Sequence, residues 1–201
     1  MNNKAILIAA AMLGSLSGCA VIPDKIDLAY QPQQGVVEMP KASQVMVAVK
    51  VTDERQDKSR VGSKTNGYGA ELAAIQTNED VTVTVQHAIE QELHARGFQS
   101  GTNATVNIDV DMTKFYNKFD VGFSSATPIS DLNMRLVVKA KAGSVLYVKE
   151  LETHVVMEKR AMLTGGNNAR IALDKAFSNA MQTLFDDKAF IAALMASTTP
   201  N

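Results

Sequence analysis

One cysteine in the chain has neighbours that predict a covalent reaction at its thiol. Cys19 follows Ser17 and Gly18, two small residues at the end of an apolar stretch that begins just after Lys4. A short positive start, an apolar stretch and small residues before a cleavage point are typical of a bacterial export signal. A cysteine directly after that point is typical of a lipoprotein signal, so we expect the thiol to accept a diacylglycerol group as a thioether. Residues 1–18 would then be the signal peptide.

Acyl chains at Cys19 would hold the protein on a membrane. Two or three chains, counting one such as palmitate on the new amino terminus, anchor stably, whereas a single chain binds only marginally. The alternative is an uncleaved transmembrane helix over residues 5–22, but Gly14 and Gly18 weaken that span. Ala20 stands where an aspartate would favour retention in the inner membrane. We therefore expect a lipid-anchored protein of the outer membrane that faces the periplasm.

Charge and cysteine content narrow the classes of partner. Cys19 is the only cysteine, so a lipidated chain has no thiol left for a disulfide. Without residues 1–18 the chain has 183 residues (201 − 18) and a formal charge of −2 (19 basic against 21 acidic residues), because Lys4 is lost. A nucleic-acid partner would need a strongly basic face, so we expect none.

Two histidines and a glutamate have the residue types of a metal site. His87 and His94 flank Glu90 on one predicted helix. Seven residues is too far for both imidazoles to reach one ion easily, since helical ligand pairs usually lie at i and i+4. A solvated helix face is the expected interpretation, and we predict no metal site and no cofactor.

Two pairs of charged residues have the types found in catalytic sites. Asp109 and Asp111 would share one strand face, as a glycosidase pair does, but both would be open to water, where a general acid is poorly placed. Asp53 and Arg55 follow the first strand as a catalytic pair or as an ordinary ion pair, and such pairs are commonly structural. No nucleophile elbow, phosphate-binding loop or zinc motif occurs. We predict no catalytic residues and therefore not an enzyme.

The periodicity of apolar residues predicts the elements that carry these side chains. Alternation with period two indicates strands, and steps of three and four indicate helices. The expected strands are 45–51, 105–114, 133–141 and 145–157, the last with a bulge, and the expected helices are 79–96, 167–184 and 188–195. A polar loop is expected over residues 56–76. This order predicts an α+β fold of two layers, an antiparallel β-sheet with two main helices on one face.

The same patterns divide the chain into segments. Residues 19–44 contain three prolines and sustain no period, so we expect a mostly extended tether after the lipidated cysteine. Packing of residues 36–39 along the domain remains open. The periplasmic α+β domain would span residues 45–196, followed by a polar tail over residues 197–201.

Five features together match one bacterial family. They are the lipobox at residues 16–19, the valine strand leading into residues 53–55, the acidic helix start at 79–80, the helix end Ala95-Arg96-Gly97-Phe98 and the alanine-rich last helix. On these features the chain resembles the YajG-like bacterial lipoproteins over most of its mature length. The resemblance implies an outer-membrane lipoprotein facing the periplasm. That family has no assigned enzymatic activity, so it supplies no catalytic residues.

The polar face of the predicted sheet is the expected contact surface. Asp109 and Asp111 would lie across from basic residues of a neighbouring strand, and each such ion pair would stabilise the sheet by about 0.2–1 kcal/mol. That structural explanation is the simpler one. The functional alternative is a protein partner on this uncovered face, with apolar anchors from the last long strand. The expected partner-binding residues are Arg135, Lys139, Tyr147 and Leu151.

Two functions of different classes remain open. The favoured one is a membrane-anchored binding or scaffolding module that docks on an envelope protein. The alternative is a carrier or sensor of a small amphiphile, such as a lipid or cell-wall fragment, in a pocket that methionines such as Met134 and Met181 would line. An enclosed pocket on the order of a few hundred Å³ would favour the carrier, and a dry core would favour the binding module.

Overall fold

The computed structural model describes residues 22–122, 125–158, 160–161 and 165–196. The predicted signal peptide, Cys19 with its predicted lipidation, and the tail at 197–201 lie outside the described residues. Within the described ranges, no helix combines the length and apolar character that crossing a bilayer requires.

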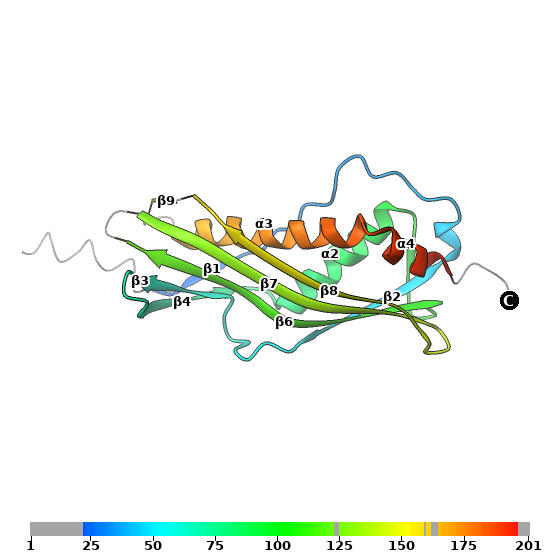
Figure 1. Ribbon diagram of the computed structural model, residues 1–201, viewed down its shortest axis with the longest axis horizontal. Coiled ribbons are helices and arrows are strands. Elements are labelled where there is room, and N and C mark those ends of the chain that lie inside the picture. Colours follow the sequence, from blue (N-terminus) through cyan, green and yellow to red (C-terminus); the bar gives the residue numbers. More distant parts are fainter. Residues whose placement is uncertain (1–21, 123–124, 159, 162–164, 197–201) are drawn as a thin grey trace, which may run out of the picture.

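The strands of the described chain form one mixed nine-stranded sheet, with helices packed against it (Figure 1). The strands are β1 (Asp24–Ile26), β2 (Met46–Asp53), β3 (Gly62–Asn66), β4 (Glu71–Thr77), β5 (Gln99–Ser100), β6 (Val106–Val121), β7 (Ser125–Ala140), β8 (Val145–Val156) and β9 (Arg160–Ala161). The helices are the short 3-10 helix η2 (Ala42–Gln44), α2 (Val81–Ala95), α3 (Gly165–Phe185) and α4 (Lys188–Met195). Helix α3 begins two residues before Asn167, the predicted cap.

A long antiparallel hairpin of β6 and β7 forms the centre of the sheet. Each strand has 16 residues, so the hairpin spans about 50 Å, most of the molecule's long axis in Figure 1. Buried residues alternate along β6 up to Met112, and after a register shift at Thr113 they alternate again from Phe115 to Val121. This change of phase is why alternation predicted only the first half of the strand.

The sheet is mixed, so the prediction of a purely antiparallel sheet is wrong, whereas the α+β class is confirmed. β2 and β3 both run parallel to β6 and pair with the same strand in succession, β2 along residues 106–112 and β3 along residues 117–121. Helix α2 lies in the connection from β2 to β6, and a crossover through a helix returns the chain parallel to the strand that it left. β8 pairs antiparallel with β7.

Helix α2 forms although its first residues alternate like a strand. The Asp80 side chain accepts a hydrogen bond of 2.8 Å from the Thr82 amide and so caps the helix. Its buried stripe has helical spacing, and the apolar residues of that stripe are Val81, Val85, Ala88, Ile89 and Leu93. Gly97 adopts a φ of 89° beyond the last turn, which turns buried Phe98 back toward the core. The predicted helix is confirmed.

The N-terminal segment, defined as residues 22–44, is packed on the domain and is not a free tether. β1 pairs parallel with β4, and the Tyr30 ring lies 5.2 Å from the Phe177 ring of α3. The Met39 amide donates to the carbonyl of Arg96 at 2.9 Å, and Ala42 is fully buried. The sequence of this segment shows no periodicity, because prolines interrupt it and because it contacts the domain through isolated residues rather than along one face.

β3 and β4 occupy the stretch predicted as a polar loop. Their buried polar residues have hydrogen-bond and ionic partners. Lys64 is 4% exposed, and its ammonium group donates to the carbonyl of Ile22 at 3.0 Å and lies 2.9 Å from the Asp24 carboxylate. Such partners lie 40 residues or more away in sequence, so local pattern gave no sign of them.

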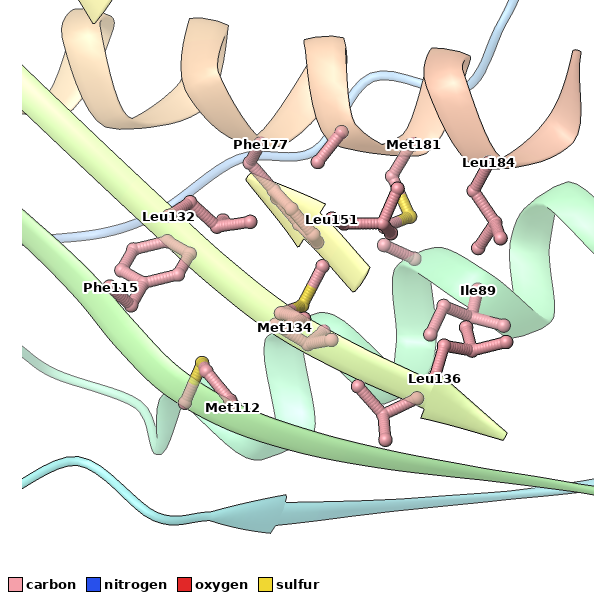
Figure 2. Close-up of a cluster of buried hydrophobic side chains, with 14 of the residues drawn as sticks. Ile89, Met112, Phe115, Leu132, Met134, Leu136, Leu151, Phe177, Met181 and Leu184 are labelled. Atoms are coloured by element: carbon pink, nitrogen blue, oxygen red, sulfur yellow. The ribbon is translucent and has the colours of Figure 1, made fainter. Parts of the chain in front are cut away.

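Side chains from the sheet and both long helices meet in one hydrophobic core (Figure 2). Met134 and Leu151 of β7 and β8 lie below Phe177 and Met181 of α3, while Ile89 enters from α2. Met134 is 1% exposed and Met181 is fully buried. These two methionines therefore fill the core among other side chains.

Candidate binding surface

The two faces of the sheet separate the four residues predicted to bind a partner, Arg135 and Lys139 on β7 from Tyr147 and Leu151 on β8. In antiparallel pairs, directly opposite residues share a face. Leu151 lies opposite Met134 and is 2% exposed, so it belongs to the core, and Tyr147 lies opposite buried Val138. Arg135 pairs with exposed Glu150 on the other side of the sheet. The expectation that Tyr147 and Leu151 share a face with Arg135 and Lys139 is wrong, because it did not take the register with β7 into account. Partner binding at Arg135 and Lys139 stays a prediction.

Tyr147 instead fastens α4 to the sheet. Its hydroxyl donates to the Asp187 carboxylate at 2.8 Å, and the Lys149 ammonium donates to the same oxygen at 3.0 Å. Asp187 also caps α4 by accepting from the Ala189 amide. Hydrogen bonds from Lys149 and then Tyr147 lower the pKa of Asp187 to about 2. The Tyr147 ring packs on Phe190 of α4, with 5.7 Å between the ring centroids.

The open face of the sheet, the face away from the helices, has ion pairs across its strands. Lys139 donates to Asp109 at 2.8 Å, so the predicted pairing of these two residues is present. The Arg135 guanidinium lies 3.2 Å from the Glu150 carboxylate, and Asp111 lies opposite Arg135 in the β6–β7 register. These side chains are a third to two-thirds exposed, where each pair contributes little to stability.

A second group on the open face surrounds Asp131. Its carboxylate lies 2.6 Å from the His154 ring and 2.9 Å from the Lys114 ammonium. Partial burial raises the pKa of Asp131, but the hydrogen bonds from His154 and Lys114 outweigh it, so the pKa is lowered overall. Charges on this face are therefore balanced by neighbours, as the structural explanation predicted.

The exposed apolar residues of β8, which we call the β8 edge, are Val145, Leu146, Val148 and Val156; by register, all of them except Leu146 at the bulge lie on the open face. Their exposed fractions are 57%, 36%, 46% and 57%. Within the described chain β8 pairs only with β7, so its second edge offers unpaired backbone groups. Leu146 is the extra residue where the register shifts by one, so the bulge lies at the start of the strand and not midway along it, where the slip in alternation predicted it.

Asp53 and Arg55 form a structural pair. The guanidinium contacts the carboxylate twice, at 2.9 and 2.8 Å, and donates to the carbonyl of Arg60 at 2.9 Å. Burial raises the pKa of Asp53, but the hydrogen bonds from Arg55 outweigh it and lower the pKa overall. Arg55 is 7% exposed, and its hydrogen bonds to Asp53 and Arg60 join the two ends of the loop between β2 and β3.

His87, Glu90 and His94 line an open depression on α2 that has a volume of about 540 Å³. Both histidines are exposed. In the described part of the chain, no three histidine, cysteine or acidic side chains come close enough together to hold a metal ion.

A buried polar cluster that was not predicted from the sequence joins the N-terminal segment to α2. Glu92 is fully buried and accepts hydrogen bonds from the Tyr30 hydroxyl at 2.5 Å and from the Gln33 amide at 2.8 Å. Arg96, one turn later, pairs with the same carboxylate and lies 4.5 Å above the Phe185 ring. The sequence contained a sign of this cluster, because Glu92 follows Ile89 by three residues and so places an acidic side chain on the apolar stripe of α2.

Comparisons with known proteins agree with this fold. The family described as "uncharacterized lipoprotein" (Lipoprotein_16) matches residues 32–195. The uncharacterized lipoprotein YajG of Escherichia coli K12 is 23% identical over 144 residues, which are 70% of this chain and 71% of YajG. The crystal structure of XCC0632 from Xanthomonas campestris superimposes with a TM-score of 0.60 at 12% identity, covering 87% of this chain and 99% of that one, which shows a shared fold. Since the family match spans most of its length, the chain belongs to the Lipoprotein_16 family of YajG-like lipoproteins.

Proposed function

We propose that the protein is a lipid-anchored module of the outer membrane that faces the periplasm and docks a protein partner along the β8 edge. Membership in a lipoprotein family implies a membrane-anchored location in the cell envelope. The lipobox at Cys19 supports lipidation, and Ala20 supports the outer membrane.

The β8 edge is the observation that carries the docking role. β8 is a 12-residue edge strand whose free backbone groups are a template for pairing with another chain, and its exposed apolar side chains flank a polar middle at Glu150, Glu152 and His154. Four of the eight large apolar residues exposed on the described chain lie on this one strand. Strand addition would satisfy its free backbone groups, while pockets for alternate side chains would give specificity.

We also propose that the protein is not an enzyme. The acidic residues that came closest to catalytic types have structural partners: Asp53 is held by Arg55, and Asp109 by Lys139. These ion pairs give the acidic residues structural roles, and they support a binding role for the protein rather than a catalytic one.

Photo-crosslinking in cells tests the docking role. A photoreactive residue replaces Val148 on the β8 edge, and in a control chain it replaces Val83, an exposed valine on α2. We expect a discrete adduct to one protein from position 148 and none from position 83. The adduct should disappear when Val156→Lys is added to the position-148 chain. Equal labelling at both positions, or an adduct that Val156→Lys leaves unchanged, would contradict docking on β8.

A small amphiphile is the second candidate ligand, because one surface groove is lined by both apolar and charged residues, among them Arg96 and Lys188. The groove has a volume of about 440 Å³ between the N-terminal segment and the helices α3 and α4. Its apolar lining residues include Val36, Val37, Met39, Phe185 and Ile191. Native mass spectrometry of the protein purified from membranes tests this idea, since a retained lipid that Val37→Asp abolishes would favour the carrier.

A further inference from the structure

The start of the folded domain fixes how far it can lie from the anchoring lipid. β1 begins at Asp24, whose carboxylate is held by the buried Lys64 ammonium at 2.9 Å. Asp24 is the fifth residue after Cys19, and five Cα-to-Cα steps span at most about 18 Å. With Cys19 lipidated, as the proposed function requires, β1 must therefore stay within that distance of the bilayer surface.

The strand register shows which part of the surface shares this end of the molecule. Asp24 pairs with Ile75 in the parallel β1–β4 ladder, so the chain before Asp24 and the chain before Ile75 lie toward the same end. Ala70, where the turn from β3 ends, is five residues before Ile75, the same count that separates Cys19 from Asp24. In Figure 1 the turn between β3 and β4 lies at one tip of the long axis, opposite the end that carries α4.

This turn, residues 66–70, has a fixed shape and an aromatic residue at its tip. The Asn66 side-chain oxygen accepts hydrogen bonds from the amides of Tyr68 and Ala70, at 3.0 and 2.9 Å. Gly69 has a φ of 82°, which glycine adopts without strain, and its amide donates to the carbonyl of Asn66. Tyr68 is 99% exposed, more than any other large apolar residue of the described chain.

From this placement we propose that the turn at residues 66–70 contacts the headgroup region of the phospholipid bilayer that carries the anchor, with Tyr68 inserted at the interface. A tyrosine suits this position because its ring is apolar and its hydroxyl is polar, and tyrosines concentrate where membranes meet water. Ile22, 58% exposed and just before β1, adds a second apolar side chain at this end.

The charges beside the turn do not oppose the contact. Glu71 at its base is paired with Arg60, which also lies 2.5 Å from Asp57. Lys118 of β6 is exposed, lies directly opposite Ser63 in the β3–β6 ladder, and adds a positive charge at the same end. Asp120, opposite Thr65, offsets this positive charge, so the contact depends on the tyrosine rather than on attraction to anionic lipids.

The chain contains no tryptophan, so a single substitution creates a specific probe. The lipidated full-length protein carrying Tyr68→Trp is reconstituted in vesicles of phosphatidylethanolamine and phosphatidylglycerol whose lipids are brominated near the headgroup. Ser144→Trp, in the exposed turn between β7 and β8 at the far end of the hairpin, is the matched control. We expect quenching at position 68 to exceed that at position 144 by about twofold or more, with emission at shorter wavelength, because only the first ring leaves water.

Flotation of the vesicles separates failure of this inference from failure of the anchor. If the protein does not float with the lipid, lipid anchoring and the proposed function fail together. If both variants float but their tryptophans are quenched equally, the anchor holds and the proposed contact is wrong. Stronger quenching at position 144 would reverse the orientation and also overturn the proposal.

Discussion

Glu92 shows at the residue scale how a buried charge depends on its partners. Its carboxylate is fully buried on α2 and receives hydrogen bonds from Tyr30 and Gln33 in addition to the ion pair with Arg96. Burial and the hydrogen bond to Glu92 raise the pKa of Tyr30 above its ordinary value, so the hydroxyl remains a donor across the physiological range. A buried ion pair is tolerated only when such extra hydrogen bonds satisfy it. The cluster therefore joins the N-terminal segment to α2 as one unit.

Ionisation of Asp187 should make the free energy of unfolding depend on pH in a measurable way. Its pKa of about 2 in the folded protein lies below the ordinary aspartate value, because the ionised form is bonded by Lys149 and Tyr147. The stability it contributes is complete above about pH 4 and is lost as pH falls through about 2. Asp187→Asn keeps the cap on α4 but removes the charge. We expect this variant to be less stable at neutral pH, with the difference shrinking toward pH 2 in urea unfolding. A difference that stays constant over this range would contradict the assignment.

Residue-level prediction succeeded where the partners are close in sequence. Asp53 and Arg55 are two positions apart, so their pairing was visible as one of two possibilities, and the structure has the ion pair. Tyr147 and Leu151 were misplaced because their direction depends on the register with β7, which sequence alternation on one strand does not determine.

At the element scale, β3 depends on close backbone contact with β6. A Cβ atom added at Gly62 would lie 2.3 Å from the backbone oxygen of Asn117, which neither strand can accommodate without moving. We expect Gly62→Ala to destabilise the fold by about 1–3 kcal/mol or more, because overpacking forces backbone shifts. Gly67→Ala is the control, since its added Cβ meets nothing within 4 Å. Denaturant midpoints of the two variants test this, and equal midpoints would show that β3 can adjust.

The elements that sequence predicted well are those with an internal pattern. Helix α2 has a cap at Asp80 and an apolar stripe, and both exist in the structure. β3 and β4 were missed because their polar residues are buried by distant partners, as Lys64 is by Ile22 and Asp24. The parallel direction of β2 relative to β6 was also missed, because it results from the crossover through α2 and leaves no pattern in the sequence of either strand.

At the scale of the whole molecule, the N-terminal segment changes where the domain begins. The predicted boundary at residue 45 excluded residues that cover the core, including Ile26 and Ala42, which are 5% and 0% exposed. Their apolar surface and the Tyr30 contact with Phe177 close the helix side of the molecule. The domain therefore begins near β1, which leaves few residues between the fold and the predicted anchor.

Truncation tests this boundary directly. A chain starting at Val45 would leave Glu92 and Arg96 without Tyr30 and Gln33 and would expose core side chains such as Phe177 to water. We expect it to lose cooperative thermal unfolding, monitored by near-ultraviolet circular dichroism, because it lacks both apolar cover and the hydrogen bonds of a buried charge. A chain starting at Ile22 keeps all these contacts and should unfold cooperatively, like the full-length mature protein. If the shorter chain unfolds cooperatively at the same temperature as the longer one, the segment is an attachment rather than part of the core, and the domain can move away from the membrane on a tether of more than 20 residues.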